Sequence, residues 1–362
     1  MDTSRLLAAS EGLVTPVAAV DVEVAQANLL GLAELARDAG VALRPHAKTH
    51  KSPWVAERQL AHGAVGLTVA TLHEAQVFLE AGVHDLLLAH PPAGDPKLRR
   101  LTELSERTPR LGVVVDDLEL AAALPPGVDV LWEVDSGLHR TGSEPGAVSA
   151  DAVQRLVDRV GSTRFRGLTT HGGHAYRATT PAAREQAARE EAESLRVTAE
   201  LVRESGIEVR ELSVGSTPTA AFAASFPWVT EMRPGTYVFG DANQVALGAH
   251  TLEQCALGVV ATVISRPAPD RVVFDAGSKA LSTDSAAPGT VGVAHILGHP
   301  GLVAERFSEE HCVAVGESGL AVGDRAVILP NHVCTTVNLH PALLCVTGDT
   351  AEWRPVSARG WQ

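Results

Sequence analysis

Apolar segments that could form buried strands recur eight times between Val41 and Phe239, and helical segments separate them. Each segment is apolar at successive positions, which is typical of parallel strands covered by helices on both faces. The segments begin at Val41, Val65, Asp85, Leu111, Val128, Phe165, Arg210 and Trp228. This pattern predicts an α/β protein with a (β/α)8 TIM barrel. A doubly wound open sheet is the alternative, but no GxGxxG follows the first strand.

Beyond Gly240 the sequence changes to short β-rich pieces separated by Gly, Pro and Asp, with no convincing helix. "LGVVATVISR", "RVVFDAG" and "DRAVILP" are examples. We therefore expect a second, smaller β domain. The predicted division is a barrel at residues 20–242 and a β-rich domain made of residues 1–19 and 243–362.

Charge and composition narrow the classes of partner. The net charge is −13 and no long basic run occurs, which argues against nucleic acid or an anionic membrane surface as a partner. The first twenty residues include Asp2, Glu11 and Pro16, so we expect no signal peptide, and no window is apolar enough to span a membrane. The four cysteines form no CxxC pair, which favours reduced thiols in the cytoplasm.

In a barrel of this type the chemistry lies where the strands end. The polar residues just past the predicted strands are rich in histidine, hydroxyl and cationic groups, as an anionic ligand with an aromatic ring and a phosphate would require. They are Lys48, Thr71, His73, His90, Asp116, Asp135, Arg140, His171, His174, Ser216, Thr217, Arg233 and Tyr237.

Two glycine turns follow the last two predicted strands. "SVGSTPT" places backbone N–H groups and two hydroxyls at a helix start, which is a possible anion site but also a common helix cap. "MRPGTYVFGD" forms the second turn. The last strands of a barrel are where phosphates are often held, so the two turns could bind one phosphate together.

Lysine is rare in this chain, because only four of its thirty basic residues are lysines. A surface role is the usual interpretation of a single lysine, and Lys97 in "DPKLRR" fits it. Lys48 follows the first barrel strand instead, in "RPHAKTHKSP". A lysine near phosphate-binding turns suits a Schiff base with pyridoxal phosphate, which arginine cannot form.

Seven motifs, in order over nearly the whole chain, together resemble the D-serine dehydratase/D-threonine aldolase family. They are "RPHAKTHK", "DSGLHRTG", "THGGHAY", "VGSTPT", "RPGTYVFGD", "DAGSKALSTD" and "PNHVCTTVNL". The resemblance implies a pyridoxal phosphate enzyme of fold type III, with an alanine racemase-like barrel and a homodimeric assembly.

The resemblance also assigns roles to single residues. Lys48 resembles the cofactor lysine, which also removes the Cα proton of the substrate. Arg140 matches the arginine on the cofactor's phenolic oxygen, and His171 the residue near the ring face. Tyr176 and Arg233 are alternatives for the pyridine nitrogen. The remaining residues assigned to the cofactor are Ser216, Thr217, Gly235, Thr236 and Tyr237.

A metal site is suggested by "PNHVC", where His332 and Cys334 would share one face at the end of a strand. Imidazole and thiolate favour Zn²⁺, but two ligands are fewer than a catalytic zinc site usually has. The resemblance strengthens this interpretation, since the dehydratases carry His-x-Cys there. The aldolases usually carry His-x-Asp, which suits Mn²⁺ or Mg²⁺.

The predicted function is a pyridoxal phosphate- and zinc-dependent dehydratase of a D-3-hydroxy amino acid such as D-serine, giving a 2-oxo acid and ammonia. A metal-dependent D-threonine aldolase, which would give glycine and an aldehyde, is the first alternative. An amino-acid racemase and a non-catalytic pyridoxal phosphate-binding protein are further alternatives.

Overall fold

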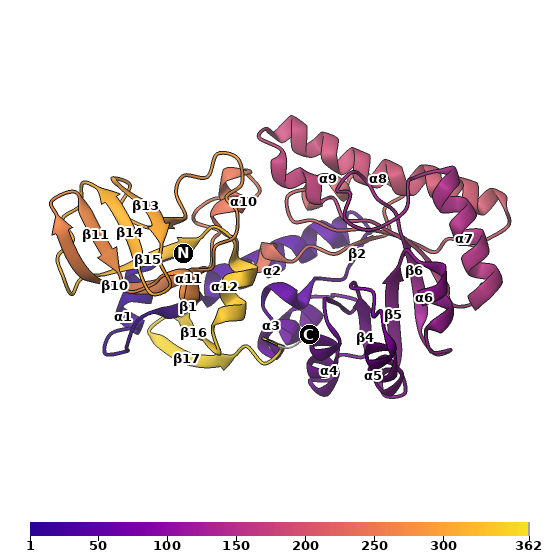
Figure 1. Cartoon of the computed structure of the whole chain (residues 1–362), viewed down its shortest axis with the longest axis horizontal. Coiled ribbons are helices and arrows are strands. Elements are labelled where there is room, and N and C mark those ends of the chain that lie inside the picture. The colour runs from indigo at the N-terminus through magenta and orange to yellow at the C-terminus, as the bar shows by residue number, and fades with distance from the viewer. Residues whose placement is uncertain (361–362) are drawn as a thin grey trace. The chain divides into compact units, whose positions relative to one another are not determined.

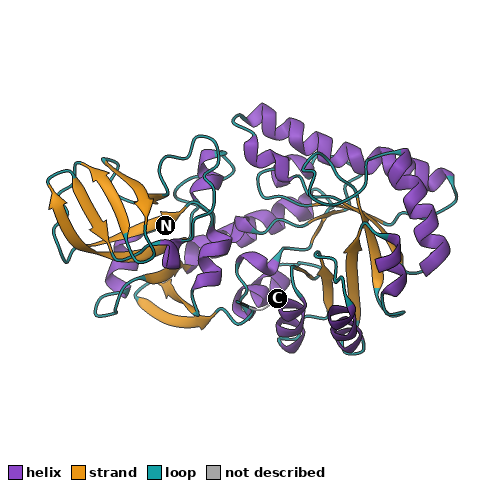
Figure 2. Ribbon diagram, viewed as in Figure 1, coloured by secondary structure: helices purple, strands orange, loops and turns teal. Residues whose placement is uncertain are grey.

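The structure is a computed structural model that describes residues 1–360 as two units, each built around its own sheet (Figures 1 and 2). The barrel unit contains residues Leu32–Lys48 and Val55–Gly235. The β unit contains residues Met1–Gly31, Thr49–Trp54 and Thr236–Gly360. Both units are discontinuous in sequence.

The sheet of the barrel unit has eight parallel strands in the order β2-β9-β8-β7-β6-β5-β4-β3. A parallel bridge between His46 and Thr68 joins its two outermost strands and closes it. The predicted (β/α)8 barrel with a separate β domain is therefore confirmed. The strands are β2 (Ala42–Leu43), β3 (Leu67–Val69), β4 (Asp85–Leu88), β5 (Arg110–Val115), β6 (Asp129–Glu133), β7 (Phe165–Thr169), β8 (Glu211–Val214) and β9 (Glu231–Met232).

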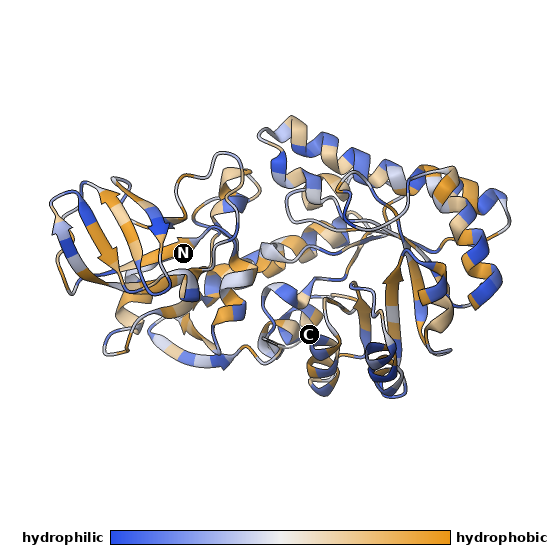
Figure 3. Cartoon of the chain, viewed as in Figure 1, coloured by the Kyte–Doolittle hydropathy of each residue, from blue (hydrophilic) through white to orange (hydrophobic). Residues whose placement is uncertain are grey.

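Helices connect these strands, and the sequence determines where the longest of them begins. Thr180 accepts a hydrogen bond from the N–H of Ala183, and Pro181 occupies the first helical position, where it lacks only an N–H that the helix would not use. Figure 3 shows hydrophilic and hydrophobic residues alternating along this helix, α8. The connecting helices are α3 (Pro53–Ala61), α4 (Leu72–Glu80), α5 (Asp95–Ser105), α6 (Leu118–Ala123), α7 (Ala147–Val160), α8 (Pro181–Glu204) and α9 (Ala220–Ala223), and α2 (Val22–Asp38) precedes β2.

Charged side chains fill the end of the barrel at which the strands begin. Arg44 is 1% exposed, and its guanidinium donates to Asp85 at 2.6 Å and to Glu231 at 2.7 Å. Buried charges are tolerated only when they are paired and hydrogen-bonded. The ion-pair network continues from Asp85 through Arg110, Glu211 and Arg166. Gly112 leaves room for it, since an added Cβ there would lie 2.8 Å from Nη1 of Arg166.

The sheet of the β unit follows the order β13-β14-β11-β10-β1-β16-β17, and β15 pairs with both β10 and β12. Helix α1 (Thr3–Ala9) contributes Leu6 to an apolar core that includes Val17, Val260 and Leu344. The strands are β1 (Val17–Asp21), β10 (Leu257–Ala268), β11 (Arg271–Phe274), β12 (Ala294–Ile296), β13 (Leu302–Phe307), β14 (Cys312–Gly316), β15 (Arg325–Pro330), β16 (Ala342–Thr347) and β17 (Thr350–Pro355).

The prediction that no helix follows Gly240 is wrong, because three short helices occur in that region. They are α10 (Ala242–Ala246), α11 (Ser278–Leu281) and α12 (Val333–Leu339). The β-branched sequence of α12 has low intrinsic helix propensity. Tertiary contacts override it, since the hydroxyl of Thr336 donates to the carbonyl oxygens of Leu281 and His332. Across residues 1–360, no helix is both long and apolar enough to cross a membrane.

Candidate active site

Lys48 lies on a 3₁₀ turn, Ala47–Thr49, that directly follows the first barrel strand. Its backbone N–H donates to Nδ1 of His46 at 3.4 Å, and the N–H of His46 donates to the carbonyl oxygen of Pro234 at 3.0 Å. Hydrogen bonds through His46 thus connect the turn that carries Lys48 to Pro234, the residue before Gly235. The second lysine of the motif has different surroundings, because Nζ of Lys51 donates to the carbonyl oxygen of Ala358 in the β unit.

Three other predicted cofactor residues, Lys48, Arg140 and Arg233, act on the imidazole of His171 through their positive charges. Nδ1 of His171 lies 2.5 Å from the carbonyl oxygen of Gly215, so Nδ1 carries the proton and Nε2 is an acceptor. Burial, together with the positive charges of Lys48, Arg140 and Arg233, lowers the pKa of His171 to about 3. The ring is therefore neutral at physiological pH and sits in a strongly cationic environment, as an anionic ligand would require.

This depressed pKa predicts a pH effect on stability. The unfolded chain, with an ordinary histidine pKa of 6.5, binds a proton that folded His171 does not bind until about pH 3. The stability that neutral His171 contributes is present above pH 6.5 and is lost as the pH falls, by up to about 1.4 kcal/mol per pH unit. Urea midpoints should fall faster with acidification in the wild type than in His171→Gln. Parallel profiles would contradict this prediction.

Arg233 points into the barrel, where it is 9% exposed. Its Nη2 donates to the carbonyl oxygen of Thr170 at 2.7 Å, and its Nη1 donates to the hydroxyl of Ser213. Both terminal nitrogens therefore have partners in the barrel wall. Tyr176, the other candidate for the pyridine nitrogen, lies partly buried in the 3₁₀ helix Gly173–Arg177 that follows β7.

The turn after β8 offers hydroxyl groups to a ligand. Ser216 is buried, and among the described residues neither its Oγ nor the buried Oγ1 of Thr217 has a hydrogen-bond partner. Thr236, in the 3₁₀ helix Thr236–Val238 of the β unit, also has a buried Oγ1 without a partner in residues 1–360. Unpaired buried hydroxyls are costly. Ser216 and Thr217 of the barrel unit thus have hydrogen-bonding capacity left for a ligand, which fits a phosphate group, and Thr236 of the β unit has the same capacity by itself.

Tyr237 is 4% exposed, and its carbonyl oxygen lies 3.0 Å from Nε2 of His250. A carboxylate that the sequence did not single out, Glu133, lies at the end of β6. Burial raises the pKa of Glu133, although Thr141, Arg140 and Arg233 oppose this effect.

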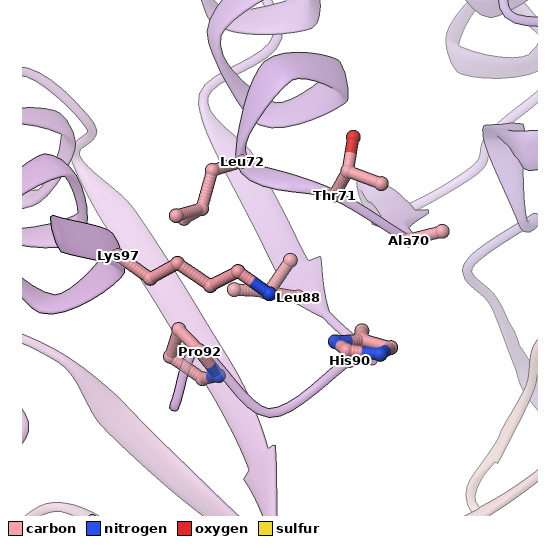
Figure 4. A pocket seen from close by; sticks show the side chains of 7 residues that line it. All are labelled: Ala70, Thr71, Leu72, Leu88, His90, Pro92 and Lys97. Carbon is pink, nitrogen blue, oxygen red and sulfur yellow. The ribbon is translucent and has the colours of Figure 1, made fainter. Parts of the chain in front are cut away.

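A small hollow of about 330 Å³ opens beside the ends of β3 and β4 (Figure 4). Its wall is mostly apolar, and Lys97 reaches into it from α5. Thr71 and His90, both predicted as polar strand-end residues, also line it. The hollow thus combines aliphatic surface with one amine, one imidazole and one hydroxyl.

His332 and Cys334 are neighbours in the β unit, but not on a strand as predicted. His332 is the N-cap of α12, and Cys334 lies in the first turn of that helix. Nδ1 of His332 lies 3.3 Å from Asp241, and the hydroxyl of Thr49 lies 3.1 Å from the sulfur of Cys334. Burial lowers the pKa of His332, but the negative charges of Cys334 and Asp241 outweigh burial and raise it well above its usual range.

Asp241 is a carboxylate beside this pair that the sequence interpretation did not single out. It is fully buried, caps α10 through the N–H of Gln244, and accepts the N–H of Val333 at 3.0 Å. The "DANQ" sequence, an Asp N-cap with Gln three residues later, is a capping signal that could have identified it. Within residues 1–360, no group of three His, Cys, Asp or Glu side chains has the arrangement of a metal site.

Comparisons with known proteins identify the family. The family model "Alanine racemase, N-terminal domain" matches residues 20–243, and "Putative serine dehydratase domain" matches residues 256–346. A D-threonine aldolase from Arthrobacter sp. is 35% identical over 96% of this chain and 93% of its own length. The chain belongs to the D-serine dehydratase/D-threonine aldolase family. It is a lyase of this pyridoxal phosphate-dependent family.

A second curated relative and its solved structure also match this chain over nearly its whole length. A D-threo-3-hydroxyaspartate dehydratase from Delftia sp. (strain HT23) is 35% identical over 96% of this chain and 98% of its own length. Its solved structure has a TM-score of 0.88 and 32% identity, and the match covers 100% of both chains. A D-threo-3-hydroxyaspartate dehydratase has also been solved as a histidine-to-alanine mutant and, in the metal-free form, as a cysteine-to-alanine mutant.

Proposed function

We propose that this member of the family is a zinc-dependent dehydratase that converts a D-3-hydroxy amino acid, with D-serine as the model substrate, to a 2-oxo acid and ammonia. The observation that carries the proposal is the adjacent pair His332 and Cys334. Nitrogen and sulfur donors favour zinc, whereas an aspartate in place of the cysteine would favour a harder metal ion.

The barrel residues support the cofactor half of the proposal. When bound, pyridoxal phosphate would withdraw electrons from the substrate's Cα and so make its proton more acidic. Lys48 would hold the cofactor and act as the base that takes the Cα proton. The unpaired hydroxyls of Ser216 and Thr217 would bind the phosphate. Tyr176 and Arg233 are the two candidates for the partner of the ring nitrogen, and Arg233 already donates to Ser213 and Thr170.

The remaining cofactor residues complete the proposed site. Neutral His171 would face the cofactor ring and keep Nε2 as an acceptor, and Arg140 would meet the phenolic oxygen. The backbone of Gly235 and the side chains of Thr236 and Tyr237 would complete the phosphate end.

The contact between Asp241 and Nδ1 of His332 supports the proposed metal site. A carboxylate on one ring nitrogen fixes the tautomer and leaves the other nitrogen for a metal ion. Zinc bound by His332 and Cys334 would act as a Lewis acid on the β-hydroxyl that leaves. In the solved mutants of a D-threo-3-hydroxyaspartate dehydratase the substituted histidine and cysteine are also two positions apart, and the cysteine-mutant structure is of the metal-free form.

Retro-aldol cleavage is the second candidate, favoured by the 35% identity to the Arthrobacter D-threonine aldolase. The two reactions give different products from the same substrates. Purified protein should be incubated with D-serine, D-threonine and 3-hydroxy-D-aspartate, with and without a chelator. We expect a 2-oxo acid and ammonia that disappear with the chelator. Glycine with an aldehyde would establish the aldolase instead.

Replacing Cys334 with alanine should remove bound zinc and lower the dehydratase rate by about 10²-fold or more, because the leaving hydroxyl loses its Lewis acid. Metal analysis of the purified protein and the rate of 2-oxo acid formation measure the two effects. Cys312→Ala is the matched control, since Cys312 is a buried cysteine on β14. Full zinc content in Cys334→Ala would remove the metal assignment.

The family resemblance also supports a homodimer. Sedimentation equilibrium of the purified protein should give twice the mass of the 37.9 kDa chain. A single-chain mass at micromolar concentration would contradict this assembly.

A further inference from the structure

Glu191 is a fully buried carboxylate in the middle of α8. Its Oε1 accepts hydrogen bonds from the N–H groups of Gly172 and Gly215, both at 2.8 Å. Its Oε2 accepts the hydroxyl of Thr219 at 3.0 Å. One side chain of a covering helix therefore binds the backbone of two separate segments that follow β7 and β8.

These two segments carry the groups proposed to hold the cofactor. Gly172 follows His171 directly, and Gly215 precedes Ser216. The carbonyl oxygen of Gly215 also accepts the Nδ1 proton of His171. The carboxylate thus fixes both partners of the His171 hydrogen bond, one through each segment.

The fit around the carboxylate is close. A Cβ added at Gly172 would lie 2.5 Å from Oε2 of Glu191, so the loop approaches the helix more closely than any side chain would allow. Contacts with the segment after α9 also hold helix α8 in place. Arg189 and Arg196 stack on Phe226 and Trp228, and Nε1 of Trp228 donates to the carbonyl oxygen of Ala192 at 3.0 Å.

Packing of α8 alone would not require a carboxylate at this position. The flanking residues on the same face, Ala188, Ala192 and Leu195, are apolar and fully buried. Burial raises the pKa of Glu191, although the three hydrogen bonds and the charge of Arg233 oppose this. Placing an acid in this apolar face lowers stability unless its hydrogen bonds compensate, so the position of Glu191 is explained by the two N–H groups that it accepts.

We propose that Glu191 is a positioning residue that holds the segments after β7 and β8 in the arrangement that binds the cofactor. It sets the ring of His171 and the hydroxyls of Ser216 and Thr217 through backbone hydrogen bonds, without touching the cofactor itself. The inference rests on the proposed cofactor site.

The test uses the full-length protein and two readouts. The first is the dissociation constant of pyridoxal phosphate, measured by absorbance titration of cofactor-free protein. The second is hydrogen exchange of the amides of Gly172 and Gly215. Glu191→Ala should weaken cofactor binding by about tenfold or more and speed exchange at both amides. Glu191→Gln should stay within about threefold of the wild type, because its amide oxygen can still accept both N–H groups.

Thr198→Val is the matched control. Thr198 is fully buried on the same helix, but its hydroxyl accepts the N–H of Gly146, which precedes α7. This variant should keep wild-type cofactor affinity and exchange at both glycines, even where it lowers stability. Gly172→Ala tests the same contact from the loop side if Glu191→Ala does not fold, and it should also weaken cofactor binding.

Wild-type affinity and protection in both Glu191→Ala and Gly172→Ala would overturn the inference. An equal loss of affinity in Thr198→Val would do the same, since any damage to α8 would then be sufficient. If the wild-type protein itself does not bind pyridoxal phosphate, the proposed function fails. The exchange rates at Gly172 and Gly215 still decide in that case whether Glu191 holds the two segments.

Discussion

Lys48→Ala should abolish the visible absorbance of the lysine-bound cofactor and reduce 2-oxo acid formation by at least about 10³-fold. The variant loses both the amine that bonds to the cofactor and the base that takes the Cα proton, and lost proton transfer alone accounts for about 10²–10⁴-fold. Absorbance spectra of the purified protein and the initial rate with D-serine measure the two effects. Lys48 is the residue whose replacement is expected to remove both the lysine-bound absorbance and the 2-oxo acid formation.

Two control variants separate the roles of the amine and its charge. Lys48→Arg keeps a positive charge beside His171 but cannot bond to the cofactor, so it should be as inactive as Lys48→Ala. Lys51→Ala should keep the absorbance, because Lys51 is hydrogen-bonded to Ala358 in the β unit. Normal lysine-bound absorbance in Lys48→Ala would show that another lysine holds the cofactor.

Glu231→Ala should lower the free energy of unfolding by about 3–5 kcal/mol, because it removes one partner of a buried ion pair and leaves the other charged. Arg44 would keep only Asp85, and the hydroxyl of Ser213 would lose the carboxylate to which it donates at 2.6 Å. Burial lowers the pKa of Arg44, but the two acids outweigh this and raise it above its usual value. Arg44 therefore stays protonated and cannot relieve the loss by neutralisation.

Urea unfolding followed by circular dichroism measures this effect, with Arg110→Ala as the control. Arg110 belongs to the same network, but its side chain is 49% exposed, so its removal should cost about 1 kcal/mol or less. Glu231→Gln should fall between the two, since it keeps a hydrogen-bonding oxygen without the charge. The prediction fails if Glu231→Ala unfolds at the same urea concentration as Arg110→Ala.

Local patterns predicted the barrel well. The helices Pro53–Ala61 and Pro181–Glu204 each begin at a proline, and Thr180 also caps the second, so local sequence marks where both helices start. Helical spacing from Ala188 to Leu195 also places Glu191 on the buried face of α8. The sequence therefore carried a signal for that residue, but the signal does not say which backbone groups the carboxylate meets.

Other features depend on contacts between distant parts of the chain. Asp241 and His332 are far apart in sequence, so nothing local predicts that the carboxylate orients the imidazole. Arg44 begins the basic motif "RPHAKTHKSP", which suggests an exposed turn. It is nevertheless buried, because Gly66 leaves space for its guanidinium. The sequence of α12 is rich in β-branched residues, which favour strands, yet it forms a helix. The prediction that Cys334 lies at the end of a strand is therefore wrong.

The bridge that closes the barrel lies close to Lys48 in the sequence. Thr68 donates its N–H to Pro45 at 2.9 Å and its hydroxyl to the carbonyl oxygen of Arg44 at 3.1 Å, only a few residues before Lys48. The backbone just before Lys48 is thus held by the same contacts that join the first and second barrel strands. With Lys48 in its proposed role, cofactor binding and closure of the barrel would be thermodynamically linked, so that each favours the other.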